Sequence, residues 1–233
     1  MPIVESAIDR KVRLFFESDR RQQFGQPADD WVWDGKTACG HTCWQKLLRL
    51  WTGRIVSLNT VNALAGMPRN ARAANGQPRG MRIEESKALV RRTGLPYVLR
   101  VNVTAAQIRE WSTRGPVLYG TRYGSMPDKR GYVYNGVRAD GRPNGFARLN
   151  GRTQLTGAEN IRHAVILVAE RRVTTSTGAL LRIEDLRFDP NHGSPSRPER
   201  PPYDVISPGQ LARELADYSA TKFAFIPTRS LPT

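Results

Sequence analysis

The spacing of apolar residues divides the chain into a mainly helical first part and a mainly β second part. Apolar residues and cysteines recur at helical spacing from Cys39 to Trp51, and Gly53 ends the pattern. The same period predicts further helices over residues 5–24, 58–65, 81–93, 104–113 and 208–217. The first of these is expected to be an N-terminal arm or docking helix.

The second part of the chain has the short apolar runs that are typical of strands. Strands are predicted over residues 96–101, 117–120, 163–169, 179–188 and 222–226. The run His163–Ala169 is almost continuously apolar, as expected of a central strand, and the Gly-rich residues 121–160 suggest hairpins. Residues 189–202 hold five prolines and are predicted to be irregular. Helices first and strands second predict an α+β fold with two halves and a cleft between them.

Length and composition exclude several classes of protein. The chain has 233 residues, 39% of them hydrophobic, which suits one globular domain with a short arm. No run of about 18 apolar residues is present, so we expect no membrane insertion. The charged N-terminus lacks the apolar segment of a secretion signal, and two cysteines cannot build a disulfide scaffold.

The charge of the chain points to anionic partners. Lys and Arg number 36 against 21 Asp and Glu, a net charge of +15. Such a field attracts nucleic acid, acidic protein surfaces or anionic lipid. The arginines are scattered in runs no longer than two, whereas a nucleic-acid footprint usually clusters. We therefore rank an acidic protein partner above nucleic acid, and an Arg-biased composition would explain the charge equally well.

Cys39 begins the clearest helix, and this position favours its thiolate. Unpaired N–H groups and the positive end of the helix dipole meet at a helix N-terminus. The thiolate is the nucleophilic form of cysteine, and Gly40 leaves room for a substrate to approach. The alternative is that Cys39 and Cys43 are small buried hydrophobic residues.

His163 and Asp189 are expected to lie at one edge of the sheet. His163 begins one predicted strand and Asp189 ends the next, and neighbouring antiparallel strands bring these ends together. An acid beside a histidine orients the imidazole, as in a catalytic triad. With Cys39 facing the pair, the chain would hold a nucleophile, a base and an orienting group. His41, in the first helical turn, is a candidate to line the same cleft.

Four segments of the chain, taken together, resemble papain-like cysteine peptidases. ACGHTCWQKLLRLWTG resembles the nucleophile helix, RGPVLYG the strand before the histidine, HAVILVAE the histidine strand, and FDPNHG the Asp-Pro turn. The resemblance covers about residues 33–195. It is closest to bacterial double-glycine leader peptidases and to papain-like effector or toxin proteases of bacteria.

The resemblance implies a papain-like two-lobed α+β fold, with an N-terminal helical half packed against a C-terminal antiparallel sheet. Residues 1–30 would be a helical arm and residues 31–233 the protease domain. Cys39, His163 and Asp189 would form the triad, although Cys43-Trp44 copies the Cys-Trp pair of papain itself. The family has a Gln about six residues before the nucleophile, where this chain has Trp33; an indole N–H or a loop amide would have to supply that oxyanion donor.

The resemblance also implies a biological setting. We expect a peptidase without metal or cofactor, delivered as a bacterial effector or toxin, acting on a protein and held by an acidic immunity or inhibitor protein. The same triad can carry out deamidation or transglutamination through a thioester. Two other hypotheses stay open: a basic nucleic-acid-binding module without a catalytic cysteine, and an inactive papain-like scaffold that only binds.

Overall fold

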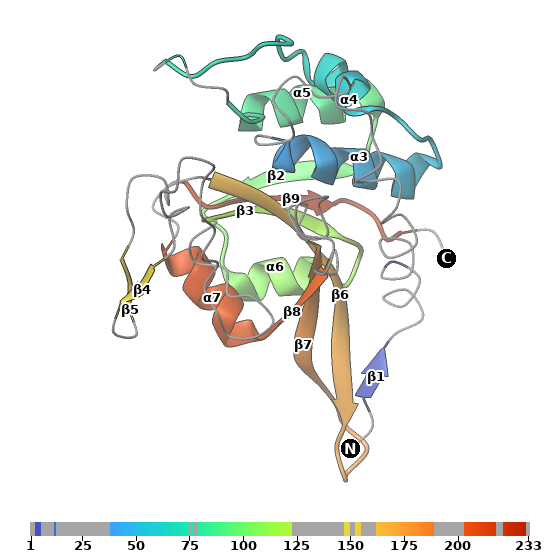
Figure 1. Cartoon of the computed structure of the whole chain (residues 1–233). Helices are drawn as coiled ribbons and strands as arrows, with labels where there is room; N and C mark the ends of the chain where they lie inside the picture. The colour runs from blue at the N-terminus through green and yellow to red at the C-terminus, as the bar shows by residue number, and fades with distance from the viewer. Residues whose placement is uncertain are drawn as a thin grey trace.

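An antiparallel sheet lies between two layers of helices in the protein (Figure 1). The computed structural model describes residues 3–5, 12, 38–74, 76, 79–122, 147–149, 152–154, 162–188, 203–217 and 221–231. The predicted division between arm and domain at residue 30 lies outside these ranges.

Seven of the described strands form the main sheet, in the order β2-β9-β3-β6-β7-β8, with β1 beside the far part of β6. All of their pairings are antiparallel. The strands are β1 (Ile3–Glu5), β2 (Tyr97–Val101), β3 (Val117–Arg122), β6 (Arg162–Thr174), β7 (Leu180–Phe188), β8 (Tyr203–Ile206) and β9 (Phe223–Pro227). A separate hairpin joins β4 (Ala147–Leu149) to β5 (Arg152–Gln154).

Three helices form the layer on the first face of the sheet: α3 (Cys39–Thr52), α4 (Leu58–Ala65) and α5 (Ile83–Thr93). Trp44 is the centre of this layer. Its ring packs edge-on against Tyr97 at 5.7 Å and Phe225 at 5.1 Å between centroids, and its indole N–H donates to Ser86 Oγ at 3.0 Å. Edge-to-face packing of this kind fixes the distance and angle between α3 and the sheet.

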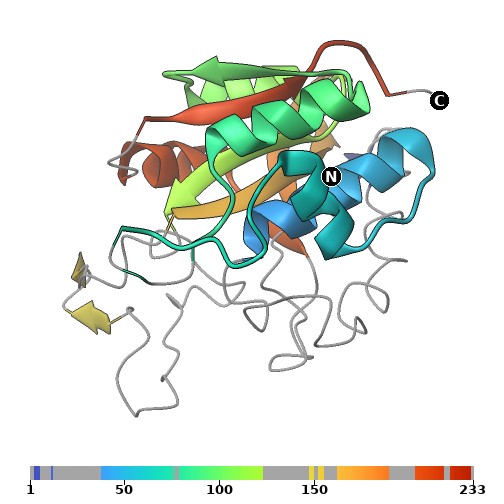
Figure 2. The same ribbon diagram turned by 90° about the horizontal axis from the view of Figure 1, so that it is seen from above.

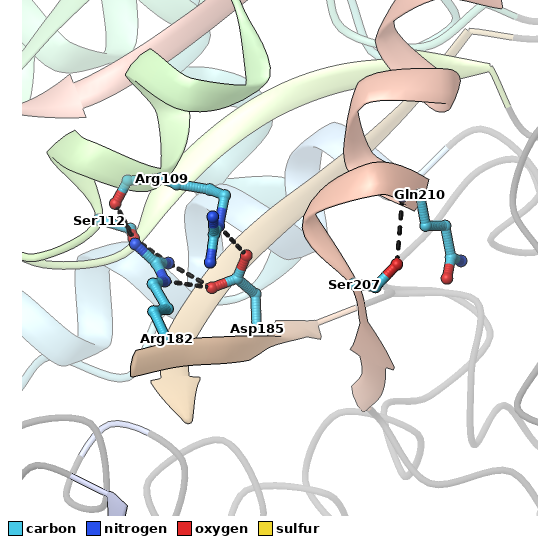
Figure 3. A network of polar contacts seen from close by, with 6 residues as sticks. All are labelled: Arg109, Ser112, Arg182, Asp185, Ser207 and Gln210. Atoms are coloured by element: carbon cyan, nitrogen blue, oxygen red, sulfur yellow. Dashed lines mark hydrogen bonds and ion pairs between the residues drawn. The ribbon is translucent and has the colours of Figure 1, made fainter. Parts of the chain in front are cut away.

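Two helices cover the second face: α6 (Ala105–Trp111) and α7 (Pro208–Asp217). Ile108 and Leu211 bring their apolar sides against the sheet. This layer also buries charges. Asp185 of β7 accepts from Arg109 Nε at 2.7 Å and from Arg182, whose guanidinium also donates to Ser112 Oγ at 2.9 Å (Figure 3).

A second ion pair lies deeper in the same layer. Arg187 Nη1 donates to both carboxylate oxygens of Glu214 at 2.7 Å, and both side chains are fully buried. Thr121 Oγ1 contacts the same carboxylate at 3.5 Å. Charges removed from water in this way are tolerated only when each has its partner, so α7 is held to β7 by a pair that depends on both members.

The structure confirms the fold class predicted from the sequence. The fold is α+β, with N-terminal helices packed against an antiparallel sheet. Helices α3 to α7 occur at the predicted positions to within two residues. The simple order of helices before strands did not predict that α6 and α7 would cover the opposite face.

Three elements differ from the prediction. Strand β6 runs to Thr174 rather than ending at Ala169, because its polar second half pairs with β1 on one side and β7 on the other. Strand β8 follows the Pro-rich stretch and was not predicted. Glu5 ends β1 instead of beginning a helix; of the predicted helix over 5–24, only Val12 is otherwise described, and it is helical and buried.

Candidate active site

Cys39 is the first residue of α3, and the N-cap residue before it makes no side-chain hydrogen bond to the helix. The residue before it is Ala38, whose methyl group accepts no hydrogen bond, and the first turn contains no acidic residue. The helices α4, α6 and α7 are preceded by Ser57, Thr104 and Ser207, and the hydroxyl of each accepts from a backbone N–H of its helix. The uncapped N–H groups and the dipole of α3 therefore act on the Cys39 thiol, where they favour negative charge.

His163 is the second residue of β6, at the end of the strand that lies beside α3. It is 3% exposed and pairs in register with Thr121 of β3. The next residue, Ala164, contacts α3 directly: its carbonyl accepts from the thiol of Cys43 at 3.4 Å. The start of β6 is thereby fixed against the first two turns of α3.

The structure brings Cys39 and His163 into contact. Burial alone would raise the pKa of the Cys39 thiol, but a hydrogen bond with His163 and the charge of its ring lower it. Backbone hydrogen bonds from Ala164 and Gly40 lower it further, and the net pKa of Cys39 lies below the ordinary value for a thiol. A thiol in this environment is more ionised, and so more nucleophilic, than a free cysteine.

Cys43 lies in a different environment one helical turn later. It is fully buried in the core cluster with Trp44 and Leu47, whereas Cys39 is partly exposed. Its contact with the Ala164 carbonyl is to an acceptor, which favours the protonated thiol rather than the thiolate. The two cysteines between which the sequence left a choice thus differ in access and in hydrogen bonding.

Two of the predicted site residues lie outside the described part of the chain. These are Asp189, the proposed orienting acid, and Trp33, the proposed oxyanion donor. The last described residue of β7, Phe188, pairs with Ile166, so β7 ends near the end of β6 that carries His163. The strand pairing that would place an acid beside His163 is therefore present as far as residue 188.

His41 does not line a cleft. The ring is fully buried, and its Nε2 lies 3.1 Å from Asn62 Oδ1. Because the Asn62 amide donates to the Met67 carbonyl at 2.7 Å, its oxygen is the acceptor for the histidine. Burial lowers the pKa of His41 to about 4, so the ring is neutral at pH 7 and holds α3 to α4.

The sequence did not predict that residues 79–82 approach Gly40, the residue after Cys39. A Cβ placed on Gly40 would lie 3.2 Å from the Cβ of Met81, so this segment passes directly over the residue after Cys39. The glycine that was predicted to make room for a substrate also makes room for the chain itself. The sequence offers one signal for this contact, the loop residues Gly80 and Met81 that follow Gly40 by 40 residues. That signal is too weak to predict a contact.

Comparison with solved structures finds a similar chain, described as a "putative C39-like peptidase" from Bacillus anthracis. The alignment covers 84% of this chain and 91% of that one, at 9% sequence identity and a TM-score of 0.47. No protein-family model and no curated protein matches the sequence. At this identity no residue role can be transferred, so the roles considered below depend on the contacts of this chain.

Neither a bilayer span nor a metal site is found in the described ranges. None of the helices there is both long and apolar enough to cross a membrane. No group of three or more His, Cys, Asp or Glu residues in those ranges has the arrangement of a metal-ligand cluster.

Proposed function

We propose that the protein is a cysteine peptidase in which Cys39 is the nucleophile and His163 the general base. The observation that supports this most directly is the hydrogen bond between the Cys39 thiol and His163, formed at the start of α3, where the N-cap residue Ala38 makes no side-chain cap. Nucleophile and base within hydrogen-bond reach are the minimum that covalent catalysis needs.

The proposed reaction begins when the Cys39 thiolate attacks the carbonyl carbon of a substrate amide and a C–S bond forms. The His163 imidazolium donates its proton to the leaving amine nitrogen, and the C–N bond breaks to leave a thioester. His163, now neutral, takes a proton from water, whose oxygen attacks the thioester. The C–S bond then breaks, and a carboxylic acid and the Cys39–His163 pair are released.

Backbone N–H groups at the start of α3 are the proposed oxyanion donors. The first intrahelical bond runs from Thr42 N to Ala38 O at 2.8 Å, so the N–H of Cys39 precedes the helical ladder and can point at a substrate oxygen. Donors fixed before the reaction lower the barrier without reorganisation, and loss of one such donor costs about 10²–10³ in rate. Asp189 remains the proposed orienting group for His163.

Alkylation at mildly acidic pH tests the reactive thiol. We expect iodoacetamide at pH 6 to label Cys39 in the folded protein faster than it labels the unfolded chain. The variant Cys43→Ala is the matched control, since it removes the other cysteine and should leave the fast rate unchanged. In His163→Ala the fast rate should be lost. Equal rates for the folded and unfolded protein would contradict the proposal.

Proteomics of cells that express wild type or Cys39→Ala distinguishes the reactions that share a thioester. New protein termini that depend on Cys39 support peptide hydrolysis. Gln-to-Glu mass shifts without new termini would mean that the acceptor chemistry is deamidation, and Gln-linked amines would mean transglutamination. Neither change would indicate the binding scaffold.

We further propose that the peptidase serves as a bacterial effector or toxin that an acidic inhibitor protein restrains. The support is the net charge of +15, which would speed association with an acidic partner. The rate of association with such an inhibitor should fall as ionic strength rises, and a rate independent of salt would contradict this.

A further inference from the structure

We propose that the substrate is an acidic segment of a polypeptide, which a cationic surface beside Cys39 recruits. This inference rests on the proposed peptidase function and specifies its substrate class. The cationic surface consists of the described residues between α4 and α5, which are 66–74, 76 and 79–82. Its exposed charges are Arg69, Arg72 and Arg82.

The cationic surface passes the end of the helix that carries Cys39. Figure 2 shows the connection between α4 and α5 passing the N-terminal end of α3. The contact is close, since a Cβ on Gly40 would come within 3.2 Å of Met81, the residue before Arg82. The charges of Glu85 and Arg79 also act on the pKa of His41, two residues after Cys39. The connection that carries Arg69, Arg72 and Arg82 therefore passes the end of α3 at which Cys39 lies.

The charge of this region is one-sided. Residues 38–94 contain ten Lys and Arg but only two acids, Glu84 and Glu85, a net charge of +8. Both acids are already paired: Glu84 binds Lys87 at 2.9 Å, and Glu85 binds Arg79 through two hydrogen bonds of 2.5 and 2.8 Å. Both acids thus lie against residues of the same region, and the formal charge of residues 38–94 remains +8.

The pair between Arg79 and Glu85 supports the surface rather than forming part of its excess charge. Arg79 also donates to the Gly80 carbonyl at 3.1 Å, and Glu85 accepts from the backbone N–H of Arg82 at 2.7 Å. These bonds fix the backbone on both sides of Met81. A fixed backbone places Arg82 in a defined position near the end of α3, so the charge there is directional.

The rest of the described chain is more balanced. The described residues from 95 onward contain fourteen Lys and Arg and seven acids, and three of those charged pairs lie in the buried network of the second face. Buried pairs contribute little to the field outside the molecule. Among the described residues, the excess of positive charge is therefore densest in residues 38–94, which include Cys39.

The composition of the cationic surface favours a polypeptide over a nucleic acid. Residues 66–82 contain no aromatic side chain, and single-stranded nucleic acids are commonly held by stacking on aromatic rings. Carboxylates of Asp and Glu pair with separate guanidinium groups and need no stacking platform. The bond that the site is proposed to cleave is also an amide of a polypeptide.

The charge of the alkylating reagent tests the inference at Cys39 itself. Iodoacetate is an anion and iodoacetamide is neutral. The rate with iodoacetate divided by the rate with iodoacetamide therefore reports the electrostatic potential at the thiol. In wild type at about 20 mM salt we expect this ratio to exceed that of the unfolded chain, and about 300 mM salt should reduce it because charges more than a few ångströms apart are then screened.

Two triple variants locate the source of that potential. Arg69→Glu, Arg72→Glu and Arg82→Glu together should lower the ratio about tenfold at low salt, the lower end of the range for electrostatic steering. The second triple variant makes the same change in net charge at exposed positions outside residues 38–94, with Arg100→Glu, Arg114→Glu and Arg213→Glu. It should lower the ratio less than twofold. The thiolate fraction affects both reagents equally and cancels in the ratio, and reaction with iodoacetamide that stays faster than in the unfolded chain shows that each variant is folded. A Gln series at the same positions gives a milder second test.

Peptides with one cleavable core and either four Glu or four Lys in the flanking residues test the substrate class. We expect kcat/KM to be higher for the acidic peptide and the preference to be lost in the first triple variant but kept in the second. Equal effects of the two triples, or no preference, would overturn the inference. Protection of Cys39 from iodoacetate by a 20-nucleotide single strand but not by the acidic peptide would also overturn it.

The failure of this inference can be told from the failure of the proposed function. If Cys39 in the folded protein reacts with neutral iodoacetamide no faster than the unfolded chain at pH 6, the peptidase proposal fails. If that reaction is fast but the iodoacetate ratio does not depend on Arg69, Arg72 and Arg82, only the acidic-substrate inference fails.

Discussion

The two faces of the sheet use polar groups in opposite ways. On the second face, the charged side chains of β7, α6 and α7 bind one another and are removed from water. On the first face, α3 packs through aromatic and aliphatic contacts, while its N-terminus is left uncapped beside the thiol of Cys39. The second face pairs its charged groups with one another, whereas on the first face the start of α3, beside Cys39, has no N-cap side chain.

This difference shows why a reactive group and a structural ion pair can occur in one small domain. Helix α7 begins with Ser207, whose hydroxyl accepts from Gln210 N at 3.2 Å (Figure 3). The N-cap residue of helix α3 is Ala38, which makes no such bond. Stability that a cap would add to α3 is missing at the one helix end where free N–H groups act on a thiol.

The largest expected effect is on the second face. Glu214→Ala leaves the buried Arg187 without its carboxylate, and we expect the free energy of unfolding to fall by about 3–5 kcal/mol. Urea denaturation measures it. The matched control, Glu110→Ala on the exposed side of α6, should change it by less than about 0.5 kcal/mol.

A double variant sharpens this prediction. Arg187→Met with Glu214→Leu removes both charges and should recover most of the loss, because apolar residues of similar volume often replace a buried pair without cost. A double variant as unstable as Glu214→Ala would mean that packing of α7, rather than the uncompensated charge, causes the effect.

On the first face, we expect the largest loss of stability to come from a cavity in the core rather than from an unpaired charge. Leu47→Ala in α3 removes a fully buried side chain from the core cluster, and we expect a loss of about 2–5 kcal/mol. Leu50→Ala, at a partly buried position of the same helix, is the control and should cost less. Thermal or urea unfolding gives both values, and equal losses would contradict the central position of Leu47.

The pH dependence of stability should reveal the one buried histidine of α3. The pKa of His41 falls from 6.5 to about 4 on folding, so between these pH values the unfolded chain binds more protons than the folded one. Stability therefore rises with pH across that window, and His41 alone should account for about 3 kcal/mol between pH 4 and 7.

His41→Gln isolates this contribution. Glutamine can still donate to Asn62, but it does not titrate, so the variant should lose less stability than wild type when the pH is lowered from 7 to 4. Urea midpoints measured at several pH values test this. Parallel profiles for the two proteins would show that His41 titrates normally.

The smallest effect compares the two kinds of helix start. Ser207→Ala should cost about 1 kcal/mol, the usual contribution of an N-cap hydroxyl. Ala38→Ser should not gain this amount, because Ala38 has φ −87° and ψ 0° and lies outside the extended region in which a serine caps. A gain of about 1 kcal/mol would show that the start of α3 can accept a cap.

Local patterns predicted the elements of the first face well. The helix from Cys39 to Gly53 follows from apolar spacing and from the left-handed conformation that Gly53 adopts, with φ 70°. The start of β6 follows from the apolar run after His163. The second half of β6 and all of β8 were not predicted, since their residues are polar or follow prolines, and only partner strands stabilise them.

The roles of single polar residues were harder to predict. Lys46 and Arg187 have the same residue types as the exposed cations of the chain, yet both are buried. His41 was expected in a cleft because it lies next to Cys39, but helical geometry turns it toward Asn62. The choice between Cys39 and Cys43 as nucleophile stays a prediction, now supported by a difference in environment.

The sequence by itself determined the positions of most helices and strands, the α+β class and the excess of positive charge, because spacing, glycine punctuation and composition are local properties. Only the tertiary structure decided which thiol meets the imidazole, which charges are buried, and which connection passes the start of α3. Those relations join residues far apart in the chain, as Cys39 and His163 are, and arise only when α3 is packed against β6.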